Sequence, residues 1–194
     1  MNHKEATSKT DKELVELTLE NHDYFLHLIN RYEKKLLNYI IRISGVMHEE
    51  AEDILQEVFI KIYQNLNDFD ASLKFSSWAY RIAHNMTINH YRKKQARPQS
   101  VFLDPENDFL ENIASELNLE QEVDLEFLRE NINKILNDLR QEYREILVLK
   151  FLEQKSYKEI SDILKKPIGT VGTLVNRAKK QFQDELKNRN FKLN

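Results

Sequence analysis

Apolar residues recur every three or four positions along most of this sequence, the spacing that gathers them on one face of an α-helix. The clearest stripe lies in a helix expected at about 22–44 and consists of Phe25, Leu28, Ile29, Tyr32, Leu36 and Ile40. Only three glycines and three prolines occur in 194 residues. That number leaves little material for the turns of an all-β fold. We therefore expect an all-α protein.

The stripes divide into two groups, which predict two small helical domains. Residues 1–97 contain a helix after the capping-box pattern Thr10–Glu13 and further helices at about 22–44, 48–66 and 75–94. Residues 98–124 are acidic, carry Pro98 and Pro105, and show no sustained stripe, which is typical of a linker. Residues 125–194 resume the helical pattern, with helices expected at about 141–152, 157–164 and 168–187.

Charge is strongly segregated although the formal net charge is only −3. Residues 71–97 carry six Lys or Arg and no acid, residues 98–126 carry nine Asp or Glu and no base, and residues 165–192 carry eight bases against two acids. A single charge run is usually a solvated face. Two basic blocks on amphipathic helices instead favour two nucleic-acid-binding modules joined by the acidic linker.

The pattern near the C-terminus predicts a helix-turn-helix. A capping box at Ser156–Glu159 opens a short helix, 165–167 forms a turn, and a second helix follows. The small Ser161 allows the helices to cross closely, and Val171 starts the inner face of the second helix. The outer face presents Thr173, Asn176, Arg177 and Lys180, with Lys179 beside it. Arg and Asn pair with guanine and adenine edges, and Lys with phosphate, so DNA binding is favoured over an ordinary helical hairpin.

The expected helix at 75–94 combines aromatic and basic residues. Its core face is expected to hold Phe75, Ala79, Ile82 and Met86, and its second, polar stripe holds Arg81, Asn85, Asn89 and Arg92. Trp78 and Tyr80 lie near its start, beside the loop at 69–72. Aromatic rings can stack on unpaired bases, worth about 1–3 kcal/mol per base. A core position is nonetheless the more common one for an aromatic such as Trp78.

Three segments in order carry a resemblance to a known family. They are Ala51-Glu52-Asp53-Ile54-Leu55-Gln56-Glu57-Val58-Phe59, the helix from Phe75 to Arg92, and Ser156-Tyr157-Lys158-Glu159-Ile160 with Pro167-Ile168-Gly169-Thr170-Val171. With them the chain resembles the extracytoplasmic-function (ECF) subfamily of bacterial sigma factors, the initiation subunits of RNA polymerase. The resemblance covers about 24–97 and 125–186.

The resemblance implies a sigma factor that directs core polymerase to specific promoters and promotes DNA opening. The polymerase-binding residues would be Asp53, Gln56, Glu57 and Phe59, and Glu49, Asp53 and Glu57 form an acidic stripe suited to a basic helix. The minus-ten residues would be Phe69, Lys74, Trp78, Tyr80, Arg81, Asn85, Asn89 and Arg92. The minus-thirty-five residues would be Thr170, Thr173, Asn176, Arg177, Lys179 and Lys180. The acidic linker would follow the RNA path of the polymerase.

The chain departs from the family pattern at three positions. Gly172 and Leu174 stand where the family usually has basic residues, and Asn89 stands where many members have Asp. The loss of two bases is expected to weaken phosphate anchoring at the minus-thirty-five element. Gly172 also costs a helix interior about 1 kcal/mol relative to Ala.

Other function classes find little support in the residues. The chain has no cysteine, its six histidines lack metal-ligand spacing, and no glycine-rich phosphate loop occurs, so no enzyme, metal or cofactor is expected. No apolar run approaches the roughly 20 residues of a membrane helix, and no secretory signal is apparent, so a cytoplasmic protein without a membrane segment is expected. The expected partners are core RNA polymerase and promoter DNA, with an anti-sigma factor left open.

A stand-alone helix-turn-helix regulator is the alternative. Such a protein would bind duplex DNA without polymerase. That alternative leaves the segment Asp53–Phe59 and the aromatic and basic helix without a purpose.

Overall fold

A computed structural model describes residues 8–94 and 125–190, and all regular elements in these ranges are helices. The all-α class is therefore confirmed. The chain divides into two compact units, which we describe one at a time. The first contains helices α2 to α5 and the second most of α7 to α10. The predicted linker at 98–124 lies outside the described residues.

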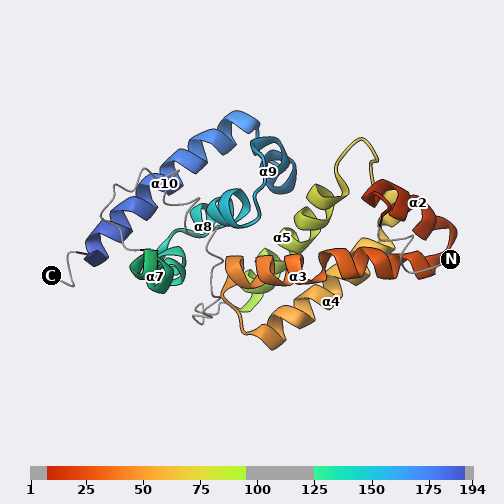
Figure 1. Cartoon of the computed structure of the whole chain (residues 1–194), viewed down its shortest axis with the longest axis horizontal. Coiled ribbons are helices and arrows are strands. Elements are labelled where there is room, and N and C mark those ends of the chain that lie inside the picture. Colours follow the sequence, from red (N-terminus) through yellow and green to blue (C-terminus); the bar gives the residue numbers. More distant parts are fainter. Residues whose placement is uncertain (1–7, 95–124, 191–194) are drawn as a thin grey trace. The chain divides into compact units, whose positions relative to one another are not determined.

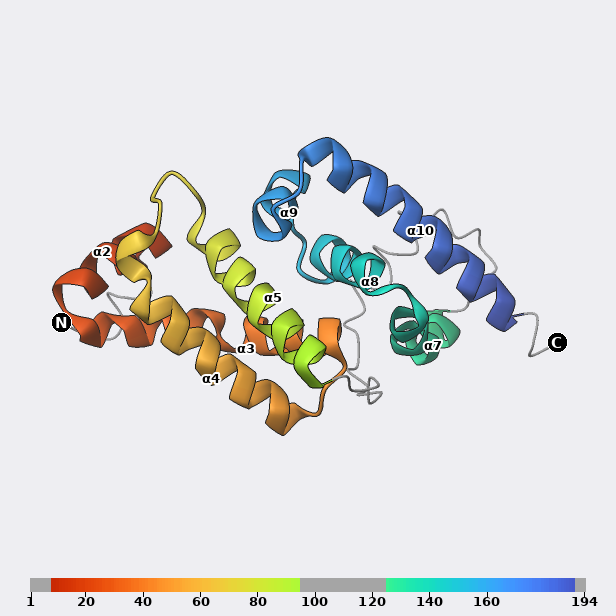
Figure 2. The same ribbon diagram turned by 180° about the vertical axis from the view of Figure 1, so that it is seen from behind.

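The first unit is a bundle of three longer helices with a short one at its edge (Figures 1 and 2). Its helices are α2 (Asp11–Glu20), α3 (Phe25–Ser44), α4 (His48–Gln64) and α5 (Phe75–Lys94), with 3-10 turns at His22–Tyr24 (η1) and Leu66–Asp68 (η2). Helices α3, α4 and α5 pack against one another, and α2 packs against α3. The loop that joins η2 to α5 thus leads directly into the predicted minus-ten helix.

Local signals explain the start of α2 and the end of α3 in this unit. The Thr10 side chain accepts from the Glu13 backbone N–H while the Glu13 carboxylate accepts from the Thr10 N–H, which completes the predicted capping box. Gly45 adopts a φ of 69°, and a glycine reaches this left-handed region without steric cost. It follows Ser44, the last residue of α3. The helix predicted at 22–44 begins only at Phe25, after the 3-10 turn η1, and the helix predicted at 48–66 ends two residues early at Gln64.

The buried face of α5 differs from the prediction. Phe75 and Ala79 are buried as expected, whereas Ile82 and Met86 are only half-buried. The face that is buried in their place comprises Ser77, Trp78, Tyr80, Ala83, Thr87 and Ile88. Helix α5 packs against both α3 and α4, so it buries a broad surface rather than one narrow stripe.

The second unit consists of α7 (Leu125–Asp138), α8 (Gln141–Leu147), a π-helical segment η3 (Val148–Leu152), α9 (Tyr157–Leu164) and α10 (Ile168–Asn190). Helix α10 packs against α7 and α8. The helix predicted at 141–152 is thus α-helical only in its first part. It ends where Gln154 turns the chain with a φ of 50°. Helix α10 continues three residues beyond the predicted end at 187.

Candidate nucleic-acid interface

The helix-turn-helix of the second unit forms as predicted. The Ser156 hydroxyl accepts from the Glu159 N–H at 3.3 Å and the Glu159 carboxylate accepts from the Ser156 N–H at 2.9 Å, so α9 begins with a complete capping box. Lys165 takes a left-handed conformation that ends α9. The Ser161 hydroxyl donates to the Lys166 carbonyl at 2.6 Å, which ties α9 to the turn. Ser161 therefore also hydrogen-bonds to the backbone of the turn.

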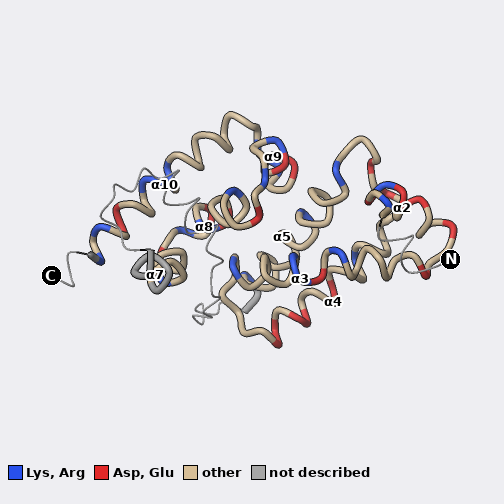
Figure 3. Tube along the Cα trace, viewed as in Figure 1, with Lys and Arg blue, Asp and Glu red and all other residues tan. Residues whose placement is uncertain are grey.

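The two faces of α10 separate as the spacing predicted. Val171, Val175 and Ala178 are fully buried, and Leu174 is 7% exposed. The outer face exposes Thr170, Thr173, Asn176, Arg177 and Lys180, with Lys179 half-buried beside them. Figure 3 shows that Lys and Arg recur along the C-terminal half of this helix. Six candidate DNA-contacting residues are therefore gathered along one helix.

The two departures in α10 have different structural settings. Leu174 belongs to the buried face, where it adds to the core of the second unit. Gly172 is half-buried, and a methyl group placed on it would meet the Tyr157 ring at 3.7 Å, an ordinary van der Waals contact. Neither position contributes a charge to the outer face, so the positive charge of this face has to come from other residues.

Helix α5 presents a polar face in the first unit. Lys74, Asn85, Asn89 and Arg92 are exposed, and Arg81 is half-buried. On a neighbouring side, the His90 Nε2 lies 2.8 Å from the Glu50 carboxylate of α4, and the His84 Nδ1 lies 3.1 Å from the Tyr39 hydroxyl of α3. These contacts attach the inner side of α5 to α4 and α3. Asn85, Asn89 and Arg92 of the predicted polar stripe stay exposed.

The aromatic residues before and within α5 form a cluster instead of an open platform. The Phe69 ring lies 5.3 Å from the Trp78 ring and 5.6 Å from the Phe75 ring. Trp78 is only 6% exposed, whereas Phe69 is half-buried at the surface of the cluster. The core position that is common for tryptophan is confirmed. Of these three rings, Phe69 retains the most surface for a contact.

Tyr80 is a correction to the predicted contact set. It is 1% exposed and its ring lies 5.0 Å from that of Tyr39 on α3. A side chain with no open surface cannot stack on a base without repacking the core. Its position beside Arg81 in the sequence gave no indication of this, because the burial depends on α3.

The loop before α5 has a defined local structure. The Asp70 carboxylate accepts from the Ser72 N–H at 2.9 Å, and the Leu73 N–H donates to the Asp70 carbonyl at 3.0 Å. The hydrogen bond from the Ser72 backbone lowers the pKa of Asp70 below its usual value. The carboxylate is therefore ionised at neutral pH and shapes the turn between Phe69 and Lys74.

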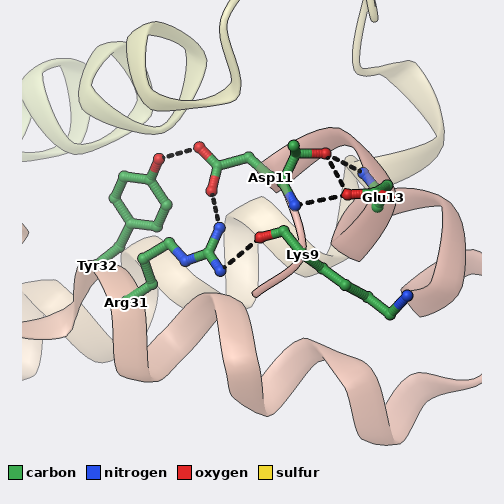
Figure 4. Close-up of polar contacts among 6 residues, drawn as sticks. Lys9, Asp11, Glu13, Arg31 and Tyr32 are labelled. Carbon is green, nitrogen blue, oxygen red and sulfur yellow. Dashed lines mark hydrogen bonds and ion pairs between the residues drawn. The ribbon is translucent and has the colours of Figure 1, made fainter. Parts of the chain in front are cut away.

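An unpredicted network joins α2 to α3 (Figure 4). The Arg31 guanidinium donates to the Asp11 carboxylate at 2.6 Å and to the Lys9 carbonyl at 2.8 Å, and the Tyr32 hydroxyl donates to the same carboxylate. Burial and the hydrogen bond to Asp11 raise the pKa of Tyr32. The Tyr32 ring lies 5.4 Å from Phe75, so α2 supports the start of α5 indirectly. Helical periodicity holds no signal for such a pairing.

Helix α4 carries the predicted acidic docking face. Asp53, Gln56 and Glu57 are exposed, and acidic positions recur along this helix (Figure 3). Phe59 is 9% exposed and packs edge-on against Phe25, so it supports the helix from within. Ile60 was not predicted as part of this face, although it is 57% exposed. Of the four predicted polymerase-binding residues, Asp53, Gln56 and Glu57 are therefore the ones exposed for contact with a partner.

The described residues contain neither a metal site nor a membrane-spanning helix. Across 8–94 and 125–190, no three His, Cys, Asp or Glu side chains come close enough to hold a metal ion. Within those same ranges, no helix combines the length and apolar character needed to cross a bilayer.

Comparisons with known proteins match both units. A family model of Sigma-70 region 2 matches residues 28–97, and a model of Sigma-70, region 4 matches residues 129–182. The ECF RNA polymerase sigma factor SigW of Bacillus subtilis is 34% identical over 184 residues, which cover 91% of this chain and 96% of the relative. The RNA polymerase sigma-H factor of Pseudomonas aeruginosa is 30% identical, with 93% of this chain and 95% of the relative covered.

Two solved structures share the fold. CnrH, in complex with the cytosolic domain of CnrY, has a TM-score of 0.69 at 22% identity, with 93% of this chain and 99% of that chain covered. The sigma factor RpoE in complex with the anti-sigma factor NepR from Bartonella quintana has a TM-score of 0.64 at 24% identity, with 84% and 96% covered.

Proposed function

Because this chain belongs to the ECF family of RNA polymerase sigma factors and directs the polymerase to promoters, we propose that its two units divide one promoter between them. Residues 1–97 recognise and open the minus-ten element and bind core polymerase. Residues 125–194 recognise the minus-thirty-five element. Residues 98–124 connect the two along the RNA path of the enzyme.

The exposed face of α5 supports the minus-ten assignment. Asn85, Asn89 and Arg92 offer amides and a guanidinium, which hydrogen-bond base edges and phosphates. The rigid attachment of the helix to α3 and α4 holds this face in place when DNA strands separate. Unstacking a base costs a few kcal/mol, which contacts to the exposed base must offset. Phe69 and the loop up to Lys74 lead directly into α5, and we assign the contact with such a base to them.

The outer face of α10 supports the minus-thirty-five assignment. Arg177 matches the bidentate edge of guanine, and Asn176 that of adenine. Thr170, Thr173, Lys179 and Lys180 supply backbone contacts along the same helix. A recognition helix enters the major groove with such a face toward the bases.

The partners and the compartment follow from this role. Asp53, Gln56 and Glu57 on α4 suit a basic helix of core polymerase. The two similar solved complexes hold CnrH with CnrY and RpoE with an anti-sigma factor, and we extend an anti-sigma partner to this chain. A protein that acts on chromosomal promoters works in the cytoplasm. As a specificity subunit it contributes contacts to initiation while the chemistry belongs to the polymerase.

The observation that carries this proposal is the pair of open polar faces, one on α5 and one on α10. The test mixes the full chain with core polymerase and a promoter library and sequences the transcript starts. We expect initiation at promoters that share two short motifs at a fixed spacing. Initiation no more specific than that of core polymerase alone would contradict the proposal. Asn85→Ala should change preference at the downstream motif and Arg177→Ala at the upstream motif, since each variant touches one unit.

A further inference from the structure

The second unit contains a surface hollow of about 300 Å³ between the start of α8 and the middle of α10. Its lining residues are Arg140, Tyr143, Arg177, Lys180, Gln181 and Asp184. Two of these, Arg140 and Tyr143, lie outside the helix-turn-helix and outside every predicted contact set. The hollow therefore extends the candidate interface onto a second element.

The hollow is cationic. Arg140, Arg177 and Lys180 are exposed, and none of the three makes an ion pair with another residue in the described part of the chain. Asp184 is the one acidic residue in the lining, which leaves an excess of two positive charges. Three such cations that face one hollow repel one another, and an anion between them would relieve that repulsion.

Arg140 is held in place by its backbone. Its carbonyl accepts from the Tyr143 N–H at 2.9 Å and the Arg144 N–H at 3.0 Å, which fixes it at the first turn of α8. Arg144 is buried, and its guanidinium donates to the carbonyls of Leu136 and Asn137 at 2.8 and 2.7 Å. These bonds fix the backbone of the corner between α7 and α8, so the Arg140 side chain starts from a defined point at the edge of the hollow.

The chemistry of the lining suits a phosphate. An arginine fork binds two phosphate oxygens, a lysine adds a point charge, and a tyrosine hydroxyl and a glutamine amide add neutral donors. Arg177 and Lys180 also belong to the outer face of α10, which in the proposed function lies against DNA. The phosphate that meets them is then one of the DNA backbone.

We propose that Arg140, with Tyr143 and Lys180, forms a phosphate-binding site that anchors the DNA backbone beside the base-reading face of α10. The inference rests on the proposed function and deepens it. In this arrangement Arg177 would lie between the phosphate-binding site and the base edges that it reads. The anchor supplies a charge from α8 at an interface where Gly172 and Leu174 supply none.

The test compares Arg140→Gln with Lys187→Gln, which removes an exposed cation of α10 that does not line the hollow. Holoenzyme made from each full-length variant is titrated with duplex promoters that differ in the upstream element, at several salt concentrations. We expect Arg140→Gln to weaken binding by about fivefold on every promoter and to reduce the slope of log K against log salt by about 0.9. Lys187→Gln should change neither quantity, and the melting temperatures of both variants should match that of the wild type.

Each other outcome has a definite meaning. If Arg140→Gln behaves like Lys187→Gln while Arg177→Ala still changes promoter preference, the anchor is wrong and the proposed function stands. A change of sequence preference in Arg140→Gln would overturn the phosphate role. A second titration uses inorganic phosphate without DNA. If phosphate binds saturably while Arg140→Gln binds promoter DNA as tightly as the wild type, the hollow is a site for a free anion and the anchor is wrong. If wild-type holoenzyme shows no promoter preference, the proposed function itself fails.

Discussion

Among single residues, Trp78 shows how burial decides between two roles that an aromatic side chain can have. Its ring packs against Phe69 and Phe75, and Phe75 in turn meets Tyr32, which donates to Asp11. Asn85 lies two turns further along the same helix and is exposed. Trp78 thus supports the fold from within, whereas Asn85 is open to the proposed contact with DNA.

We expect Trp78→Ala to lower the free energy of unfolding by about 3–5 kcal/mol, because it leaves a cavity in the aromatic cluster. Asn85→Ala should change that free energy by less than about 0.5 kcal/mol, since it removes only exposed atoms. Urea unfolding of the full chain measures both. Permanganate footprinting of promoter complexes should show impaired opening for Asn85→Ala. A stable Trp78→Ala protein that melts DNA poorly would instead indicate a direct base contact.

Glu145 carries a pH dependence of its own. Burial raises its pKa above the usual value, although the Gln141 side chain opposes this by a hydrogen bond. A carboxyl whose pKa is raised by folding stabilises the fold fully below its unfolded pKa, and this contribution is lost as the pH rises through the folded value. Above the usual pKa of glutamate, the burial of this carboxyl therefore makes the fold less stable than it is at lower pH.

We expect Glu145→Gln to raise the melting temperature at pH 7, and the gain should shrink as the pH falls toward the usual pKa of glutamate. Glu33→Gln is the control, because Glu33 is an exposed glutamate of α3 in the other unit. Its replacement should change the melting temperature little at any pH in this range. Thermal unfolding between pH 4 and 8 gives the comparison, and a pH-independent gain at 145 would contradict the role of ionisation.

At the level of elements, α10 combines a fully apolar inner face with an outer face that holds the candidate DNA contacts. Gly172 lies between these faces, inside the helix, where glycine has the greatest conformational freedom to lose. The Tyr157 ring that it approaches also lies 5.7 Å from the Lys150 ammonium. A small side chain at this position would therefore add contact with α9 without blocking the outer face.

We expect Gly172→Ala to raise the free energy of unfolding by up to about 1 kcal/mol, because alanine restricts the unfolded chain and favours the helix. Gly169→Ala provides the comparison, since a methyl group there meets nothing within 4 Å and the residue lies in the first turn. Its gain should be smaller. Urea titrations measure both variants. A lower free energy of unfolding for Gly172→Ala would mean that the Tyr157 ring cannot accommodate the added methyl group.

For the whole molecule, the role of a specificity subunit requires separate surfaces for the enzyme and for DNA. The acidic face of α4 and the polar face of α5 belong to one unit but have opposite chemical character. In the proposed function, charges of opposite sign on these helices would guide a basic polymerase helix and anionic DNA to different surfaces. Polymerase binding can then be lost while the fold and the DNA-facing residues remain intact.

We expect the double variant Asp53→Lys and Glu57→Lys to weaken association with core polymerase by more than about tenfold, because like charges would oppose a basic partner. Its melting temperature should equal that of the wild type, since both residues are exposed. Glu16→Lys, an exposed charge reversal on α2, is the control. Native gel titration with core polymerase gives the affinities, and equal binding by both variants would place the docking face elsewhere.

Much of this protein follows from short-range patterns in the chain. Helical spacing predicted the all-α class, two capping boxes predicted the starts of α2 and α9, and the ten-residue interval from Ser161 to Val171 predicted the helix-turn-helix. These features depend on neighbours within a few turns, so their physical cause is present in any short window of residues. The outer face of α10 was predictable for the same reason.

Contacts between distant segments decided the rest. The burial of Tyr80 depends on α3, the network of Asp11 with Arg31 and Tyr32 joins two helices, and Arg140 and Arg177 line one hollow because α8 packs on α10. A side chain is buried by the partner that covers it, and a charge cluster forms where separate elements converge. Periodicity along one helix holds no record of either partner, so only the tertiary structure could decide the burial of Tyr80 and the set of side chains that line the hollow.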